Sequence, residues 1–471
     1  KWQAMMTQLE AMAEEEGIVL ALRRFTTNSR KALLLAEAVK PQGRELFYRL
    51  HEGLFQGFFC EGRNIGDEAE LRAIAAEMKS RAERFAELIT MENGKPLAQA
   101  HGEVAMSIDH LLWFAEEGRR AYGRVVPPQA EGKRNLVIRQ PVGVVGAIAP
   151  WNFPLVLAIR KIAPALAAGC TVILKPASAT PLSACELARC IDAAGLPKGV
   201  FQLVAGSASE IGKELLENPN CRKISFTGST EVGRSLIQGA ADTCTELSLE
   251  LGGNAPVIVF DDADLDAAVA GAAASKYRNS GQTCICANRL LVQDGVYDAF
   301  VEKLTALVGS YRLGDGLDEA TTHGPLVSET AVADVDAFVH DALEKGAKAP
   351  IGGRRSDLGS CYYEPTVLTH VTEDMRVFNE EIFGPVAPVF RFSTEEEAIA
   401  MANDTPYGLA SYFYTRDLGR AWRVAEAIEY GLVGVNEVAI TSDVIPFGGV
   451  KESGQGREGS KYGIDDYVEI K

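Results

Sequence analysis

Short apolar runs alternate with amphipathic segments along most of the chain, and this alternation predicts the architecture. Before residue 122, apolar side chains recur at helical spacing. Helices are expected there at 31–40, 43–59, 67–89 and 103–117. From residue 142, strand-like and helix-like runs follow one another. The expected strands are 142–149, 171–175, 200–204, 223–226, 256–260, 289–292, 366–368, 386–391 and 410–414, and the expected helices are 155–168, 181–194, 208–216, 230–240, 264–279, 296–308, 394–402 and 417–428. This repeat predicts an α/β fold with parallel, doubly wound sheets.

Two segments predict extended structure outside the sheets. Residues 123–141 hold two β-prone runs around a polar turn, which predicts a hairpin. Its Pro127 and Pro128 suit an edge strand or a strand between subunits. The tail at 462–471 alternates apolar and polar residues and is expected to form a strand.

Composition narrows the classes of partner. The 471 residues suffice for two or more domains, and the net charge of -17 argues against nucleic acid and anionic membranes as partners. No run has the apolar length of a membrane span, and the start shows no signal-peptide pattern. The nine cysteines include no Cys-x-x-Cys pair, and the six histidines show no ligand spacing. These features favour free thiols in the cytoplasm and no metal site.

Candidate chemistry lies in two segments about thirty residues apart. Cys284 sits in a Gly-containing stretch at 279–289, and Glu250 lies in the segment 249–254. A thiolate that attacks a carbonyl carbon and a base that activates water are what acyl transfer through a thioester needs. Taken alone, each residue has a plainer interpretation, as a buried filler thiol or a solvated carboxylate.

Further polar residues follow the predicted strands. Asn152 lies between Pro150 and Pro154 after the first strong strand, where α/β proteins bind ligands. Lys175 ends the second strand and can meet ribose hydroxyls or a phosphate. The segment 226–233 ends the fourth strand and opens a helix, whose N-terminus favours a phosphate. It is not the Gly-x-Gly-x-x-Gly pattern, so its spacing alone is a weak signal.

These motifs, in this order, resemble the aldehyde dehydrogenase superfamily. The residues that carry the resemblance are Asn152, Lys175, 226–233, Glu250, Cys284 and the segment Glu381-Ile382-Phe383-Gly384-Pro385. It extends from about residue 70 to the end. Within the superfamily the chain is most similar to bacterial NADP-dependent succinate-semialdehyde dehydrogenases, and glutarate-semialdehyde dehydrogenases are similar too.

The resemblance implies roles for individual residues. Cys284 matches the nucleophile, and Asn152 with the backbone N–H of Cys284 matches the oxyanion hole. Glu250 matches the base that activates the hydrolytic water, which argues for a free acid product and against the CoA-acylating branch. Lys161 matches a lysine near the path of that water.

The resemblance also implies a dinucleotide site. Its residues are Trp151, Lys175, Ser178, Gly228, Ser229, Glu381 and Phe383. Relatives that prefer NAD usually carry Glu at the position of Ser178, where a carboxylate would repel a 2′-phosphate. A small neutral serine beside Lys175 therefore favours NADP, with NAD also accepted.

The implied substrate is a semialdehyde that carries a carboxylate. Arg160, Arg278 and Ser442 match positions that bind the distal carboxylate in semialdehyde-oxidising relatives, and an arginine fork suits that group. Ordinary ion pairs remain the alternative explanation for the arginines. Cys286 matches the partner of a reversible disulfide with Cys284 in some relatives, and a filler thiol is the alternative.

The start of the chain departs from the family. Residues 28–72 resemble the helical insertion of DsbA-type thioredoxin-fold proteins, without their paired cysteines. The chain then reads as a fusion, and two rival hypotheses follow: a catalytically inactive binding or structural protein, or a thiol-redox protein built on these helices.

The domain boundaries follow from these assignments. We expect an atypical helical segment at 1–70, a dinucleotide-binding domain from 71–122 and 142–250, and a catalytic domain at 251–445. The segments 123–141 and 452–471 are expected to be oligomerisation elements of a homo-oligomer, a dimer or a tetramer.

Overall fold

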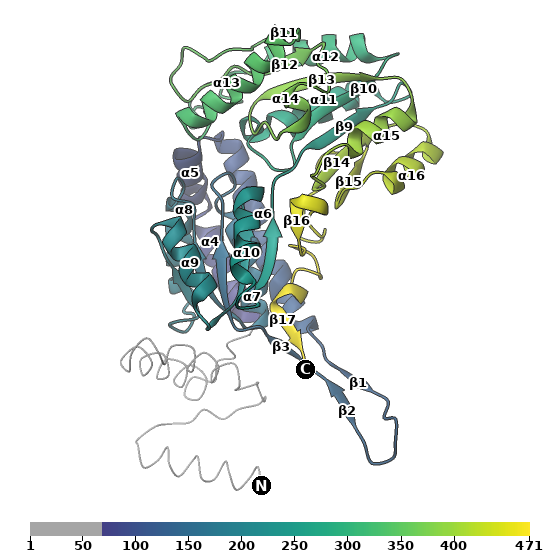
Figure 1. Cartoon of the computed structure of the whole chain (residues 1–471). Coiled ribbons are helices and arrows are strands. Elements are labelled where there is room, and N and C mark those ends of the chain that lie inside the picture. The colour runs from purple at the N-terminus through teal and green to yellow at the C-terminus, as the bar shows by residue number, and fades with distance from the viewer. Residues whose placement is uncertain (1–67) are drawn as a thin grey trace.

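The computed structural model describes residues 68–471, which form two large β-sheets, each packed against its own helices, and a projecting hairpin (Figure 1). The expected helices at 31–40 and 43–59 lie outside the described residues, as does Asp67. The α/β class and the two doubly wound sheets are confirmed.

The first sheet has six strands in the order β16-β8-β7-β4-β5-β6. Its strands are β4 (Val144–Ile148), β5 (Thr171–Lys175), β6 (Phe201–Leu203), β7 (Cys221–Thr227), β8 (Glu246–Glu250) and β16 (Gly454–Gln455). Its helices are α7 (Val156–Ala168), α8 (Leu182–Ala193), α9 (Ala208–Glu217) and α10 (Thr230–Ala240). All pairs are parallel except β16 with β8. The order reverses between β4 and β7, so the loops after these strands flank the crevice in which such sheets bind ligands.

Three helices precede this sheet and pack on it. They are α4 (Glu68–Ser80), α5 (Ala82–Asn93) and α6 (Leu97–Glu117), followed by the 3-10 turn η3 (Gly118–Arg120). The expected single helix 67–89 is wrong, because Arg81 leaves helical geometry and separates α4 from α5. The Arg81 side chain forms an ion pair with Glu186 on α8, so the break between α4 and α5 lies against a helix that covers the sheet.

The second sheet has seven strands in the order β11-β12-β13-β10-β9-β14-β15. Its strands are β9 (Ala255–Val259), β10 (Ala287–Gln293), β11 (Lys348–Ile351), β12 (Thr366–Thr369), β13 (Val386–Phe392), β14 (Ala410–Tyr414) and β15 (Leu432–Val435). Its helices and turns are α11 (Leu265–Tyr277), η4 (Arg278–Gly281), α12 (Tyr297–Gly309), α13 (Glu329–Glu344), α14 (Arg376–Asn379), α15 (Glu395–Asn403) and α16 (Leu418–Ala427). Only the edge strand β11 runs antiparallel. The sequence pattern did not predict α13, α14, β11 or β15, and in the first sheet it did not predict β8 or β16.

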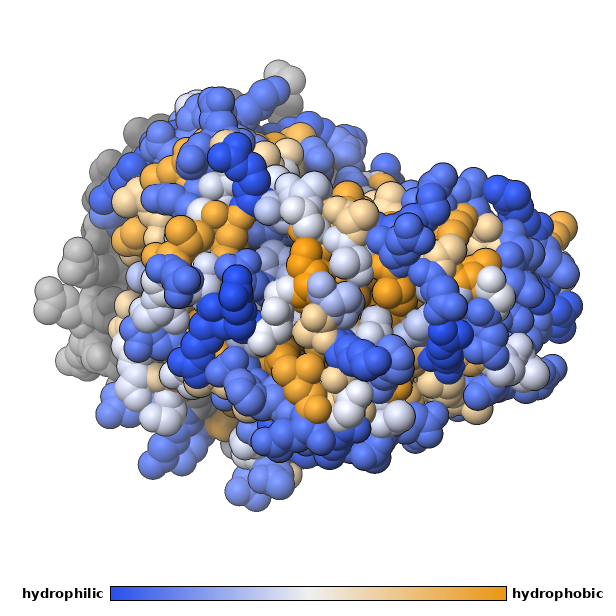
Figure 2. Space-filling model, turned by 90° about the horizontal axis from the view of Figure 1, so that it is seen from above, coloured by the Kyte–Doolittle hydropathy of each residue, from blue (hydrophilic) through white to orange (hydrophobic). Residues whose placement is uncertain are grey.

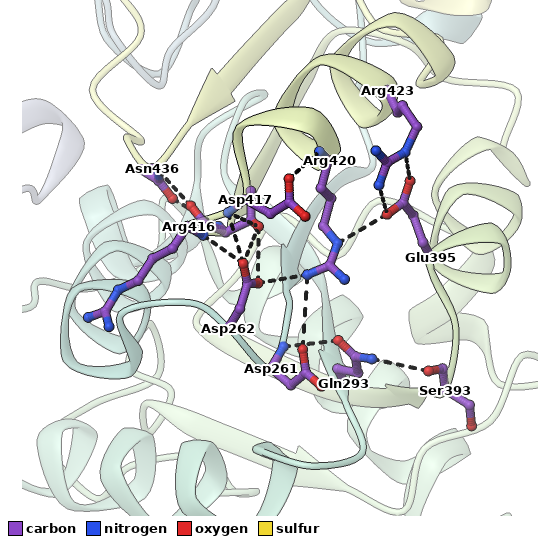
Figure 3. A network of polar contacts seen from close by, with 11 residues as sticks. Asp261, Asp262, Gln293, Ser393, Glu395, Arg416, Asp417, Arg420, Arg423 and Asn436 are labelled. Atoms are coloured by element: carbon purple, nitrogen blue, oxygen red, sulfur yellow. Dashed lines mark hydrogen bonds and ion pairs between the residues drawn. The ribbon is translucent and has the colours of Figure 1, made fainter.

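An ionic network closes the carboxyl ends of the strands in this second sheet (Figure 3). Asp262, just after β9, accepts hydrogen bonds from the Thr415 hydroxyl and from the backbone amides of Arg416 and Asp417. Arg420 on α16 joins Asp262 to Glu395 on α15. Side chains of the chain itself therefore occupy the carboxyl ends of β9 and β14, where such sheets often bind ligands.

The hairpin projects from the body of the molecule (Figure 1). It consists of β1 (Arg124–Val126) and β2 (Asn135–Val137), paired antiparallel. The third short strand, β3 (Arg139–Pro141), leaves the hairpin and pairs with the tail strand β17 (Val468–Ile470). Two short turns, η5 (Lys451–Ser453) and η6 (Asp465–Tyr467), lead into the tail.

The upper face of the molecule is mostly hydrophilic, with apolar side chains gathered in separate patches (Figure 2). No helix in the described part of the chain is long and apolar enough to cross a membrane.

Candidate active site

Cys284 follows a left-handed stretch of backbone that only a glycine can complete. Asn279, Ser280 and Gly281 all have positive φ, and a Cβ at Gly281 would lie 2.1 Å from the Gly384 carbonyl oxygen. This turn delivers Cys284, half-buried, to the wall of a cavity of about 30 Å³. Burial raises the pKa of its thiol, and the charges of Glu381 and Glu250 add to the effect.

Glu250 reaches the neighbourhood of Cys284 although Glu250 ends a strand of the first sheet and Cys284 lies in the turn before a strand of the second. Glu250 ends β8, and the chain then passes so close to the cysteine loop that a Cβ at Gly253 would lie 2.3 Å from the Cys284 carbonyl oxygen. The Glu250 carboxylate is buried, and its Oε2 atom has no hydrogen-bond partner in the described chain. Burial, reinforced by Glu458, raises its pKa well above the usual value.

Asn152 lies beside the cysteine loop with part of its amide unused. Its Nδ2 donates to the carbonyl of Gln282 over 3.2 Å, which leaves one N–H of the amide free. Within the described residues, no hydrogen bond uses the backbone N–H of Cys284. Two donors therefore remain available near the sulfur.

A buried ion pair, which the sequence analysis missed, supports the Asn152 loop. Lys95 donates to Glu103 over 2.6 Å and to the backbone carbonyl of Asn152 over 2.8 Å. Glu103 also accepts from the amides of Leu155 and Val156, at the start of α7. Burial lowers the pKa of Lys95 to about 8, opposed by Glu103. The sequence showed Lys95 only as part of a helix-ending turn, because burial of charge leaves no periodic signal.

Lys161 lies under the other side of the site. Its ammonium is fully buried, donates to the Thr227 hydroxyl over 2.6 Å and forms an ion pair with Glu458. Glu458 was not predicted, and it comes from a tail segment far away in the sequence. Since the charges of Glu458 and Lys161 shift the Glu250 pKa in opposite directions, this pair helps to set the basicity of Glu250.

Arg160 and Arg278 both line the cavity that contains Cys284. The guanidinium of Arg160 lies over the Phe447 ring and that of Arg278 over the Phe153 ring. No carboxylate in the described part of the chain lies within 4.0 Å of either guanidinium, which removes ordinary ion pairing as their explanation there. Ser442 does not line this cavity, but its buried hydroxyl has no partner among the described residues.

The residues expected to hold a dinucleotide gather at the carboxyl ends of the first sheet. Lys175 ends β5, and its ammonium makes no hydrogen bond or ion pair within 68–471. Ser178 is exposed nearby. Trp151 and Phe383 meet edge to face, with ring centroids 5.5 Å apart. Glu381 accepts from the Gly253 amide over 3.0 Å, and burial raises its pKa to about 7.

Gly228 and Ser229 form the junction between β7 and α10. Ser229 caps the helix by accepting from the Val232 amide, as its position predicts. Gly228 makes a close approach, but to the chain itself: a Cβ there would lie 2.3 Å from the Phe226 ring. The Gly228 amide donates to the Glu250 carbonyl, so it is not free for a phosphate. Ser229 at the N-terminus of α10 carries no charge, and the Lys175 ammonium has no partner among residues 68–471. The crevice is therefore still suited to an anionic ligand.

Cys286 is buried behind the site, against a buried lysine. The ammonium of Lys276 lies 3.7 Å from the Cys286 sulfur, and the thiol itself contacts the Gly281 carbonyl. Burial raises the pKa of Cys286, and Lys276 opposes that shift. No disulfide forms in the described part of the chain, so Cys284 and Cys286 are both free thiols.

Comparisons with known proteins place the chain in a family. The family model described as "Aldehyde dehydrogenase family" matches residues 68–471. The chain belongs to the aldehyde dehydrogenase family. A second family model, a DSBA-like thioredoxin domain, matches residues 1–105 of this dehydrogenase, in line with the expected resemblance of 28–72.

The dehydrogenase is similar to enzymes that act on semialdehydes. It is 59% identical over 387 residues to a glutarate-semialdehyde dehydrogenase of Pseudomonas aeruginosa, covering 82% of this chain and 80% of that protein. It is 57% identical over 394 residues to an NADP(+) succinate-semialdehyde dehydrogenase of Escherichia coli, covering 84% and 82%. A crystal structure of an E. coli NADP-dependent enzyme superimposes with a TM-score of 0.87 at 52% identity, covering 94% of this chain and 89% of that one.

Proposed function

We propose that the protein oxidises a carboxylate-bearing semialdehyde, succinate semialdehyde, to the dicarboxylic acid with NADP as the preferred acceptor. The observation that carries the proposal is the cavity where Cys284 shares a wall with Arg160 and Arg278, two arginines that form no ion pair with a carboxylate of residues 68–471. A cysteine nucleophile supplies the chemistry, and unneutralised guanidinium groups supply a site for an anionic tail.

Cys284 acts first, as the nucleophile. Its sulfur attacks the aldehyde carbon to give a thiohemiacetal, and the positive charge of Arg160 opposes the effect of burial on the thiol. The negative charge that develops on the aldehyde oxygen is met by the free N–H of Asn152 and the backbone N–H of Cys284. One such donor is worth about 3 kcal/mol in comparable sites.

Bound NAD(P) supplies the acceptor for the hydride, and Lys175, Ser178, Glu381, Trp151 and Phe383 are the residues suited to hold it. The resulting thioester on Cys284 is then opened by water. Glu250 takes a proton from that water, because its Oε2 atom is free and its raised pKa makes it a stronger base than an exposed carboxylate. The products are the carboxylic acid and the free thiol.

The neutral Ser178 supports the preference for NADP, since it lies near Lys175, which has no ion-pair partner among residues 68–471. A carboxylate at position 178 would repel a 2′-phosphate, whereas serine does not, and NAD is accepted as well. The E. coli relatives, named as NADP-dependent, point the same way.

A glutarate semialdehyde is the second candidate substrate, because a P. aeruginosa relative carries that name. The two substrates differ by one methylene, worth about 1–3 kcal/mol of discrimination.

The test is the formation of NADPH, followed by its absorbance, with succinate semialdehyde, glutarate semialdehyde and butanal as substrates. The purified full chain is expected to prefer the two charged aldehydes, and Cys284→Ala is expected to abolish turnover of all three. Residual turnover in Cys284→Ala, or a preference for butanal, would contradict the proposal.

The protein is further proposed to be a cytoplasmic homo-oligomer. The hairpin exposes Val125 and Leu136, which lie directly opposite each other at 74% and 67% exposure. An apolar pair on a projecting ribbon needs a partner surface, and another copy of the chain is the simplest one. Free cysteines throughout the described part of the chain fit a reducing compartment.

A further inference from the structure

Arg160 is held by a neutral partner. Its Nε atom donates to the Nε2 atom of His110 on α6 over 3.3 Å, and among residues 68–471 its NH2 atom has only the weakly accepting sulfur of Met106, at 3.9 Å. The guanidinium plane lies 4.5 Å above the Phe447 ring. These contacts fix the plane and use one edge of the guanidinium, so the edge formed by NH1 and NH2 remains for another ligand.

The tautomer of His110 follows from its own hydrogen bonds. Its Nδ1 atom lies 2.8 Å from the Met106 carbonyl, which can only accept, so Nδ1 carries the proton. Nε2 is then left as an acceptor for Arg160. The ring is fully buried, and burial together with the charge of Arg160 lowers its pKa to about 3, so it stays neutral over the physiological range.

We propose that His110 is a positioning residue that selects for anionic substrates: it holds the Arg160 guanidinium in place without neutralising it. The inference rests on the proposed function, because it assigns the free edge of Arg160 to the carboxylate of the semialdehyde. His110 itself does not line the cavity, so it acts only through Arg160.

The lack of charge on His110 is what lets Arg160 select an anionic substrate. A carboxylate at position 110 would hold Arg160 equally well, but it would cancel the charge that the substrate needs. An apolar residue there would leave the charge and free the guanidinium to rotate away from its productive plane. A neutral acceptor of fixed tautomer is the solution that gives both orientation and charge.

The test compares His110→Leu, His110→Glu and His110→Gln, with KM and kcat measured for succinate semialdehyde and for butanal. Leu removes the acceptor, Glu adds a negative charge, and Gln restores a neutral acceptor near the position of Nε2. We expect Leu and Glu to raise KM for the semialdehyde at least 10-fold, with KM for butanal changed less than about threefold. Gln is expected to recover most of the loss. Because the charge of Arg160 also acts on the Cys284 thiol, kcat in His110→Glu is expected to fall alike for both aldehydes, and the ratio of the two KM values is the quantity that tests the inference.

Two results would overturn the inference. Equal losses for both aldehydes in His110→Leu would make His110 a structural residue only, and an unchanged preference would make it irrelevant to specificity. If His110→Leu fails to fold, His110→Asn takes its place, because the shorter amide cannot reach Arg160. A wild-type enzyme without preference for the semialdehyde overturns the proposed function as well, whereas a preference that survives in the variants overturns only this inference.

Discussion

Glu250 must release and take up a proton during turnover, and its surroundings set the pH at which it can do so. Its pKa is raised by burial and by Glu458, so a large fraction of it is protonated at pH values where an exposed glutamate is ionised. The rate of thioester hydrolysis should therefore rise with pH through this raised pKa and fall on the acid side well above pH 4.5. A pH profile of kcat for the wild-type enzyme measures this.

Replacement of Glu250 by Gln separates the two halves of the reaction. The variant keeps Cys284 and the free donors beside it, so it should still form one equivalent of NADPH per active site in a rapid first turnover. Steady-state turnover should fall about 10²–10⁴-fold, because the water loses its base. Rapid mixing measures both quantities, and loss of the first turnover together with the steady state would exclude this division of labour.

Arg278 makes no hydrogen bond through its guanidinium within the described chain, and its five donors are available to a substrate carboxylate. Arg278→Ala should cost about 2 kcal/mol of binding and raise KM for succinate semialdehyde ~30-fold, with little change for butanal. Arg278→Lys keeps the positive charge but not the planar guanidinium, so its KM for succinate semialdehyde should lie between those of the wild type and Arg278→Ala. An equal loss for the charged and the neutral aldehyde would show that Arg278 only supports the fold.

Single residues were predictable where they belong to a motif and not where burial gives them their role. Cys284 and Glu250 were predicted in separate segments. The structure brings Glu250 close enough for its charge to act on the Cys284 thiol, although Glu250 does not line the cavity that Cys284 lines. His110 and Glu103 lie on a helix that was predicted from its apolar face, and nothing in that pattern distinguishes a buried charge from a solvated one. Whether a polar residue points inward depends on what packs against it, which is a tertiary property.

At the scale of elements, α6 joins the start of the described chain to the active site. Glu103 binds Lys95 and caps α7, and both contacts hold the Asn152 loop. Glu103→Gln would leave a buried ammonium without a counter-charge, and it should lower the free energy of unfolding by ~3–5 kcal/mol. Urea denaturation measures the loss, and Glu83→Gln is the matched control because Glu83 is exposed.

That variant should also lose activity beyond its loss of stability. At a temperature where it is fully folded, kcat should fall because Asn152 no longer has a fixed carbonyl. A variant that is less stable but has the wild-type kcat would show that the ion pair supports the fold without orienting the site.

The elements were mostly predictable because apolar periodicity follows the sheets directly. The errors fall where tertiary contacts decide the outcome. The helix break at Arg81 depends on Glu186, more than a hundred residues away in sequence. The expected hairpin 123–141 ends earlier, because β3 pairs with the tail strand β17 and not with β1 or β2.

At the scale of the whole molecule, the ionic network in Figure 3 ties together the carboxyl ends of the second sheet. Arg423 and Arg420 hold the pKa of Glu395 below its usual value. The network's contribution is therefore complete above the unfolded pKa of about 4.5 and is lost as the pH falls through the lower folded pKa. Glu395→Gln should cost ~2 kcal/mol at pH 7 and much less near pH 3, measured by urea denaturation at both values. A pH-independent cost would exclude this origin.

The hairpin makes a prediction about assembly. Val125→Lys with Leu136→Glu removes the exposed apolar pair while a favourable cross-strand pair keeps the hairpin folded. Light scattering should report a smaller particle than the wild type, and an unchanged mass would place the subunit contact elsewhere. Lys133→Gln, at an exposed position of the same hairpin loop, is the control that should leave the mass unchanged.

The strand β16, which pairs with the strand that carries Glu250, is translated after the other active-site residues. Gly454 pairs with Glu250 itself, and the nearby Glu458 neutralises Lys161. A ribosome therefore makes the nucleophile, the oxyanion donors and both arginines well before it makes the strand that flanks the base. A chain that stopped before residue 454 would lack both the strand that pairs with Glu250 and the carboxylate that pairs with Lys161, so the base would lose two of the contacts that place it.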